Sequence, residues 1–362
     1  MATKQLNLRA SAASRWIACP ASARLSALMP YVEGGEAAKI GTAIHALAET
    51  CFQLNSDPMK SIGTVVEGIK MTEENCEFAL EHLKAIWAIE DELGKDSVTV
   101  EKFLPYLDYA NVKVGGTTDV IGISKEKRKL IIADLKTGRG YVDADNDQLR
   151  LYGLAAMDDE NLYQDIDTVE LWIIQPHHGE VRKHSMTTQE LVDWEHYILT
   201  PAIENALNPL FQPVPSDSAC QYCNARTICP AQANIAEVVA TAPPVEMLTE
   251  AQISVLLTKF DMVEGYIKAV RDHALKRMES GSVIDGWQLQ PKRALRSWTD
   301  ESDAKKGLLA LGLDEDQVTK TELITPAQAE KLLTKDQKPN LEALTSRISS
   351  GLTLARDKGL TQ

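Results

Sequence analysis

The chain has 362 residues, of which 44% are hydrophobic and 25% are charged, and its formal net charge is −14. The length suits two or three domains, and the composition is that of an ordinary globular protein. The acidic excess excludes a uniformly basic protein that coats nucleic acid. It leaves room for a local basic groove, since residues 1–32 contain four basic side chains and no acid.

The sequence has no apolar run near the roughly 20 residues that span a bilayer, and its start lacks the apolar core of a signal peptide. We therefore expect a cytoplasmic protein without a membrane partner. Six cysteines in a chain of this length do not make a disulfide scaffold.

Helices are predicted over residues 40–54 and 72–93, after a short turn and helix within residues 11–30. On the first of the two, His45 and Glu49 are four residues apart and share a face. Such a pair is commonly a surface ion pair, and the pattern alone leaves its role open. Gly41 allows another segment to approach the start of this helix closely.

Next comes a predicted strand at 98–104 and then a predicted hairpin. Two β-rich apolar runs, residues 114–123 and 130–138, flank the charged connector 124–129. The remaining predicted elements are a helix at 147–157, a strand at 169–175, a helix at 187–208 that Pro201 bends, a long amphipathic helix at 246–278, a basic strand pair at 286–298 and a small helical region up to Gln362. This order predicts a mixed α/β core.

The predicted hairpin carries Asp119 in its first run and Asp134 in its second, with Lys136 two residues further on the same side. These charges are costly on a sheet face unless they pair with one another or bind a ligand. The pattern alone fits either a salt bridge between these residues or a divalent metal site. Mg²⁺ takes oxygen ligands, and the carbonyl of Leu135 or the imidazole of His45 would complete its shell, the imidazole suiting Mn²⁺ better.

Three cysteines gather late in the chain, at Cys220, Cys223 and Cys229. A structural zinc ion or an iron–sulfur cluster both need a fourth ligand, and Cys19 is the natural candidate. Tight spacing of this kind indicates metal binding. The two other cysteines lie at apolar helical positions typical of core residues.

Four segments, residues 41–45, 115–119, 134–137 and 148–152, occur in an order that resembles the successive motifs of RecB-type nucleases in the PD-(D/E)XK superfamily. The split cysteine pattern resembles the [4Fe–4S] staple of the iron–sulfur branch, which includes the AddB subunit and CRISPR-adaptation nucleases. The layout is also similar to phage and prophage RecB-like exonucleases. The resemblance covers about residues 11–232.

The resemblance implies a mixed central sheet flanked by helices, with a nuclease core in residues 1–235 and a mainly helical C-terminal extension in residues 236–362. It implies that Mg²⁺ or Mn²⁺ is held by His45, Asp119, Asp134 and the carbonyl of Leu135. It implies Lys136 as the catalytic lysine and Gln148 and Tyr152 as contacts to DNA or to the active site. Glu101 is a weaker match to an upstream strand acid, and Thr118 replaces the proline of the Pro-Asp pair.

The sequence thus predicts a metal-dependent DNA exonuclease of phage or bacterial DNA recombination, repair or processing. DNA, as single strands or duplex ends, is the expected partner, together with a recombinase or a single-strand-binding protein. One alternative is a catalytically inactive DNA-binding or scaffolding protein that keeps the fold, and another is a zinc-stapled interaction protein. Trp287 and Trp298, near basic residues, would serve DNA stacking or ordinary core-edge packing.

Overall fold

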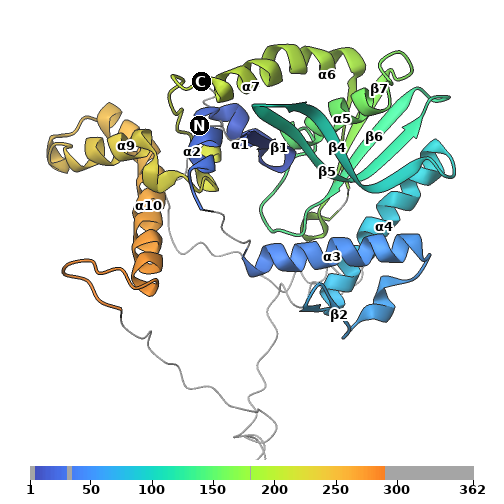
Figure 1. Ribbon diagram of the computed structural model, residues 1–362, viewed down its shortest axis with the longest axis horizontal. Helices are drawn as coiled ribbons and strands as arrows, with labels where there is room; N and C mark the ends of the chain where they lie inside the picture. Colours follow the sequence, from blue (N-terminus) through green and yellow to red (C-terminus); the bar gives the residue numbers. More distant parts are fainter. Residues whose placement is uncertain (1–4, 31–34, 180, 290–362) are drawn as a thin grey trace, which may run out of the picture. The chain divides into compact units, whose positions relative to one another are not determined.

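The computed structural model describes residues 5–30, 35–179 and 181–289, which belong to one compact unit, residues 1–289 (Figure 1). The strands of this unit are β1 Leu6–Arg9, β2 Val65–Val66, β3 Ile69–Lys70, β4 Val98–Tyr109, β5 Val112–Ser124, β6 Lys129–Leu135, β7 Thr168–Ile174 and β8 Arg182–Thr187. The longer helices are α1 Ala13–Ala18, α2 Ala21–Ala27, α3 Glu36–Gln53, α4 Glu73–Leu93, α5 Asp147–Asp159, α6 Thr188–Trp194, α7 Thr200–Leu207, α8 Asp217–Gln221, α9 Pro230–Ala240 and α10 Glu250–Glu279.

Short helical turns link these elements. They are the 3₁₀ turns η1 Ala10–Ala12, η2 Pro58–Ser61, η3 Pro176–His178, η5 Arg226–Ile228 and η6 Val245–Met247, and the π turn η4 Glu195–Leu199. None of the helices in the described part of the chain is long and apolar enough to cross a bilayer.

The six-stranded mixed sheet is built around β5. On one side, β5 pairs with β4 along nearly its whole length in antiparallel register. On the other side, the beginning of β5 pairs in parallel with β1, up to Arg9 opposite Gly115, and its end pairs with β6, from Val120 opposite Ala133. The sheet then continues from β6 to β7 in parallel and from β7 to the antiparallel edge strand β8.

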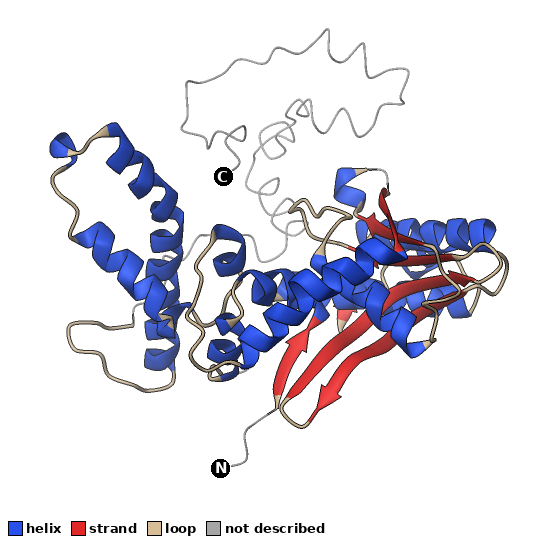
Figure 2. Ribbon diagram, turned by 90° about the horizontal axis from the view of Figure 1, so that it is seen from above, coloured by secondary structure: helices blue, strands red, loops and turns tan. Residues whose placement is uncertain are grey.

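Helices cover both faces of this sheet (Figures 1 and 2). The strands alternate buried side chains between two cores, as in β6, where Leu130 and Ile132 face one core while Ile131 and Ala133 face the other. The first core takes in α1, α5, α6 and α7, and the second takes in α3 and α4. The architecture is therefore a central mixed sheet between two helical layers.

Local sequence signals begin and end the helices that carry the site. Thr72 caps α4 by accepting a hydrogen bond from the Asn75 amide, and Gly94 follows its last residue with a positive φ. Asn146 caps α5 in the same way, through the amide of Leu149. The cap thus fixes the start of α5 one residue before Gln148.

The structure confirms the mixed α/β core, the hairpin and the helices near residues 40–54, 72–93 and 147–157. It adds β1 and β8, which the sequence did not predict. The expected helix at 187–208 is divided at the π turn η4, after which Pro201 lies in the first turn of α7. The long C-terminal helix is present as α10, but none of its residues is buried, so its apolar stripe is not a core face. The predicted strand pair at 286–298 lies mostly outside the described residues, and residues 286–289 of it form no strand.

Candidate active site

The predicted site lies at an opening in the sheet. On one side of β5, the β1 ladder ends at Gly115 and the β6 ladder begins at Val120. Residues 116–119 of β5 therefore face a gap between β1 and β6. A cavity of about 630 Å³ lies here, and it is lined by residues of β1, α3, β4, β5, β6 and α5.

Asp119 stands at the point where β5 and β6 separate. The next pair in the register would join Asp119 to Asp134, but β6 continues instead along β7, with Asp134 opposite Ile173. The Asp119 carboxylate replaces the lost ladder contact, because its Oδ2 accepts a hydrogen bond of 2.7 Å from the backbone amide of Leu135. The residue is 8% exposed. The strand separation therefore fixes this acid inside the cavity.

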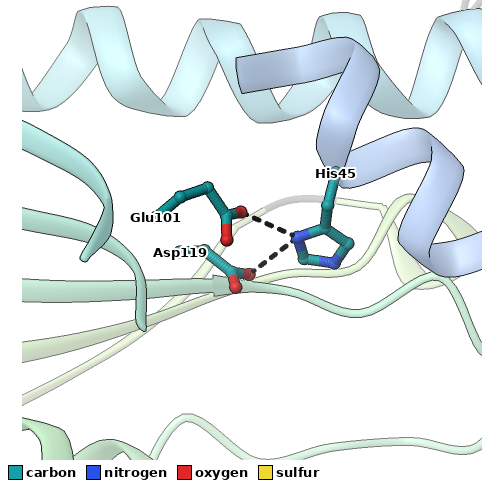
Figure 3. A group of neighbouring side chains, drawn as sticks. All are labelled: His45, Glu101 and Asp119. Carbon is teal, nitrogen blue, oxygen red and sulfur yellow. Dashed lines mark ion pairs between the residues drawn. The ribbon is translucent and has the colours of Figure 1, made fainter. Parts of the chain in front are cut away.

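His45 reaches the same point from α3 (Figure 3). Its Nδ1 lies 3.5 Å from Oδ2 of Asp119 and 3.4 Å from Oε1 of Glu101. The helix approaches the strand end closely at Gly41, where an added Cβ would lie 3.1 Å from Oγ1 of Thr137. The close approach expected at Gly41 is therefore confirmed, and it sets the distance between α3 and the acids.

Glu101 is aimed at the site by a local irregularity of β4. It lies between Val100 and Lys102, which pair with Val120 and Thr118, and its φ is +49°. A left-handed conformation within a strand is costly for a residue with a side chain. It turns Glu101 toward His45, so that donor atoms of His45, Glu101 and Asp119 all lie within 4.8 Å of one another.

Asp134, Lys136 and Gln148 form a second, adjoining group. Lys136 Nζ lies 2.7 Å from Asp134 Oδ2 as an ion pair, and it donates a hydrogen bond of 2.9 Å to Oε1 of Gln148. Gln148 Nε2 donates to Oδ1 of Asp134 at 2.8 Å. Tyr152, one turn along α5, lines the cavity, with its hydroxyl near Gly116. The side chains expected at the active site thus all belong to one region; they are His45, Glu101, Asp119, Asp134, Lys136, Gln148 and Tyr152.

In the absence of a cation, the electrostatics of the site favour a protonated Asp119 carboxyl and a charged His45 imidazole. Burial and the neighbouring Asp134 carboxylate raise the pKa of Asp119 far above its usual range. Burial alone would lower the pKa of His45, but the hydrogen bond to Glu101 and the charge of Asp119 raise it to about 9. A bound cation would offset the repulsion between these neighbouring carboxylates and favour their ionised forms.

His82 is a neighbour that the sequence analysis missed. It lies on α4, 2% exposed, with its ring centroid 6.1 Å from that of His45. Burial and the nearby His45 lower its pKa to about 3, so its imidazole is neutral and packs against His45 as an uncharged ring. Its position on the buried stripe of an amphipathic helix is typical of core residues, so periodicity gave no signal for it.

The four cysteines Cys19, Cys220, Cys223 and Cys229 line a second cavity, which is separate from the first. Cys19 follows the last residue of α1, whereas the others come from α8, the turn after it and the residue before α9. Residues from the two ends of the predicted core therefore meet here, as the split spacing required.

The surroundings of these sulfur atoms suit thiolate ligands. The backbone amide of Val214 donates to Sγ of Cys19 at 3.3 Å, and Nε2 of Gln232 donates to Sγ of Cys220 at 3.0 Å. Burial raises the pKa of both of these thiols, so their thiolate form depends on a bound cation. Buried cysteines that receive N–H donors fit a bound metal or cluster, because such donors stabilise coordinated sulfur.

The fold and the site define a mixed α/β protein with a histidine–carboxylate–lysine centre in a break of its sheet. Residues 6–359 match the family described as "Protein of unknown function (DUF2800)", and the chain belongs to that family.

Two solved structures are similar to the chain at low identity. One is a protein designated SSO0001, at 13% identity and a TM-score of 0.26, over 59% of this chain and 94% of that one. The other is a protein from Eubacterium rectale described as a "Putative exonuclease", at 11% identity and a TM-score of 0.34, over 59% of this chain and 85% of that one. Both scores are low, so the assignment of the site rests on the geometry of the chain itself.

Proposed function

We propose that the protein is a metal-dependent DNA exonuclease with a PD-(D/E)XK core of the RecB type. The observation that carries the proposal is the convergence of His45, Glu101 and Asp119, whose donor atoms lie within 4.8 Å of one another beside the Asp134–Lys136 pair. One nitrogen and several carboxylate oxygens are a donor set that suits Mg²⁺ or Mn²⁺.

Under this proposal His45, Asp119, Asp134 and the Leu135 carbonyl hold the metal, and the position of Glu101 adds it to the set. A bound divalent ion would polarise the phosphodiester and lower the pKa of a water ligand. The protein's own contribution is a fixed arrangement of donors. Asp119 is held by the Leu135 amide, and Asp134 by Gln148, so both carboxylates are oriented before the ion enters.

Lys136 supplies the fixed positive charge of the site. Its ammonium lies between Asp134 and Gln148 and lines the open cavity. In that position it would orient the attacking water or offset charge that develops on the phosphate oxygens. Tyr152 adds a neutral hydroxyl, since burial raises its pKa above the ordinary value for tyrosine.

We propose further that Cys19, Cys220, Cys223 and Cys229 hold a [4Fe–4S] cluster, with structural Zn²⁺ as the alternative occupant. Such a group would join the segment before α3 to a loop about 200 residues later. It would thereby restrain the helix that carries His45. Its role in this proposal is structural.

The test is a nuclease assay on end-labelled single-stranded and duplex DNA with anaerobically prepared protein and Mg²⁺ or Mn²⁺. Stepwise shortening from an end is expected with the wild type, and none with Asp119→Ala or after chelation. Asp261→Ala, an exposed acid on α10, is the matched control. Intact substrate with the wild type, or equal cleavage by Asp119→Ala, would overturn the proposal.

A further inference from the structure

The cavity extends well beyond the acids, along β5 toward its first residues. This part is lined by Arg9 from β1, Phe103 from β4 and Lys113 from β5. None of the three touches the metal-binding group in the contacts described above. We propose that Arg9, Phe103 and Lys113 form a strand-binding subsite that receives an unpaired DNA strand and leads it to the acids. This inference rests on the proposed function and names the substrate of that site.

The register of the sheet gives the spacing of the subsite. Phe103 lies opposite Thr117, two residues from Asp119, which corresponds to about 7 Å along the strand. Arg9 lies opposite Gly115 and Lys113 is two residues further, so their backbone positions are about 14 Å and 20 Å from Asp119 along the strand. The Lys113 ammonium lies beside the Phe103 ring, so an aromatic ring near the acids with basic side chains beyond it suits the base and the phosphates of one strand.

Phe103 is placed for stacking. It is 50% exposed on a strand whose neighbouring residue Leu104 is fully buried. The ammonium of Lys113 lies 5.3 Å from the centroid of its ring, so the two side chains lie side by side. Stacking of bases on such exposed rings is the sequence-tolerant way in which proteins bind single strands.

Lys113 is also available to a phosphate. Its one ion pair among the described residues is with Asp108, at 3.5 Å, and both side chains are more than a third exposed. Exposed pairs of this kind contribute little and exchange readily. A DNA phosphate would replace the Asp108 carboxylate, or share the ammonium with it, at little cost.

The floor of this part of the cavity is Gly115 and Gly116. Gly115 has a φ of +147°, and an added Cβ there would lie 2.3 Å from the Leu104 carbonyl oxygen. A Cβ on Gly116 would lie 3.1 Å from the hydroxyl of Tyr152. Gly115 is thus required by the close approach of β4, whereas the missing side chain of Gly116 leaves space beside Tyr152 for a sugar–phosphate backbone.

The size of the cavity favours an unpaired strand. Its volume of about 630 Å³ lies within the usual range of small-ligand pockets, roughly 300–1,000 Å³. A space of this size accepts nucleotides of one strand, and stacking on Phe103 requires a base that is not paired in a duplex. The formal charge of the whole chain is −14, so the chain as a whole would repel DNA. The attraction for a DNA strand in this proposal therefore comes from the basic side chains that line the cavity.

The inference is tested by the binding of fluorescein-labelled oligothymidylate to the full-length protein in EDTA, measured by fluorescence anisotropy over a range of salt concentrations. Phe103→Ala is expected to weaken binding roughly 5- to 150-fold without changing the salt dependence. Lys113→Gln and Arg9→Gln should each make the negative slope of log K against log salt shallower by about 0.7. Unlabelled duplex of the same length should compete at least about tenfold more weakly than the single strand.

Two controls match these variants. Tyr109→Ala removes an exposed aromatic ring from the same strand outside the cavity, and Lys125→Gln removes an exposed lysine at the far hairpin. Both should bind like the wild type. The inference is overturned if Phe103→Ala and Lys113→Gln bind like these controls, or if duplex competes better than the single strand.

Cleavage assays separate this inference from the proposed function. If the wild type cleaves DNA while Phe103→Ala and Lys113→Gln bind and cleave equally well, the subsite is wrong and the nuclease stands. If the wild type binds single strands through these residues but never cleaves them, the subsite stands and the nuclease is wrong. If both hold, Phe103→Ala should raise KM much more than it lowers kcat.

Discussion

Gln148 Nε2 donates a hydrogen bond of 2.8 Å to Oδ1 of Asp134, so the first turn of α5 is joined to the end of β6. The same amide accepts from Lys136 through its oxygen, at 2.9 Å. One side chain thereby orients both the Asp134 carboxylate and the Lys136 ammonium of the candidate site. The Asn146 cap fixes where α5 begins, and hence where this amide stands.

Gln148→Leu should therefore impair catalysis more than stability. Without the amide, Asp134 and Lys136 keep only their ion pair, and their orientation is no longer set. Loss of such a supporting partner typically lowers activity about 10- to 100-fold. We expect the loss in kcat, with the melting temperature nearly unchanged. Gln189→Leu, on the exposed face of α6, is the control, and an unchanged kcat in Gln148→Leu would contradict this assignment.

Lys136→Met should lower kcat by about 10²- to 10³-fold, the loss typical when one preorganised charge or donor is removed from an active site. Metal binding should remain, because the lysine is not among the proposed ligands. Mn²⁺ titration by calorimetry checks the second expectation, and single-turnover cleavage checks the first. Lys125→Met, whose ammonium pairs with Asp165 far from the cavity, should behave as the wild type. A variant that loses Mn²⁺ binding would show that Lys136 acts by shaping the site.

The main elements of the core were predictable because their signals are local. The hairpin followed from two apolar runs around a charged connector, and α4 from its Thr72 cap and terminal Gly94. The edge strand β8 was missed because Arg182–Thr187 is largely polar, and β1 because four residues carry little periodicity. The lack of buried residues on α10 was also beyond prediction, since an apolar stripe does not show what will cover it.

The site was predictable as a set of residues but not as a geometry. Asp119, Asp134 and Lys136 followed from charges in apolar strands, and His45 and Gln148 from the resemblance. The separation of β6 from β5 after Val120, which makes the cavity, depends on the pairing of β6 with β7. The left-handed conformation of Glu101 likewise depends on the tertiary environment, since no local signal favours it.

The stability of the metal-free protein should fall as the pH rises from about 6.5 to about 9, a range in which His82 is already neutral in both the folded and the unfolded chain. His45 has a pKa of about 9 in the folded chain, above its unfolded value, so its contribution is complete below about pH 6.5 and is lost as the pH passes 9. Asp119 acts in the same direction, because its raised pKa means that the folded chain must ionise a buried acid as the pH rises. Thermal unfolding in EDTA across this range measures the trend.

Mn²⁺ should reverse this pH dependence. The ion binds deprotonated ligands, so its affinity should rise with pH and its binding should release protons. At high pH the melting temperature with Mn²⁺ should exceed that in EDTA, and the difference should shrink toward pH 5. The effect should vanish in His45→Ala. A difference that is independent of pH would contradict the assignment of His45 as a ligand.

Asp119→Asn should stabilise the metal-free protein while abolishing cleavage. The amide oxygen can still accept the hydrogen bond from Leu135, and folding no longer requires a buried acid to take up a proton beside Asp134. We expect a gain on the order of 1–3 kcal/mol in the free energy of unfolding at neutral pH in EDTA. Asp261→Asn on the exposed α10 should change it by no more than about 0.5 kcal/mol. A lower stability of Asp119→Asn than of this control would contradict the account of the buried acid.

Cys220→Ser should remove the proposed cluster and destabilise the chain around α1 and α8. Cys220 is the buried cysteine whose sulfur accepts from Gln232, and Cys19 across the cavity accepts from Val214. Anaerobically purified wild type should be brown, with about four iron atoms and four acid-labile sulfides per chain, whereas the variant should be colourless. Cys51→Ala, at a buried cysteine of α3 outside this cavity, should keep both colour and iron. Colourless wild type with one zinc per chain, lost in Cys220→Ser, would assign the site to zinc, and metal content unaffected by Cys220→Ser would remove this cysteine from the ligand set.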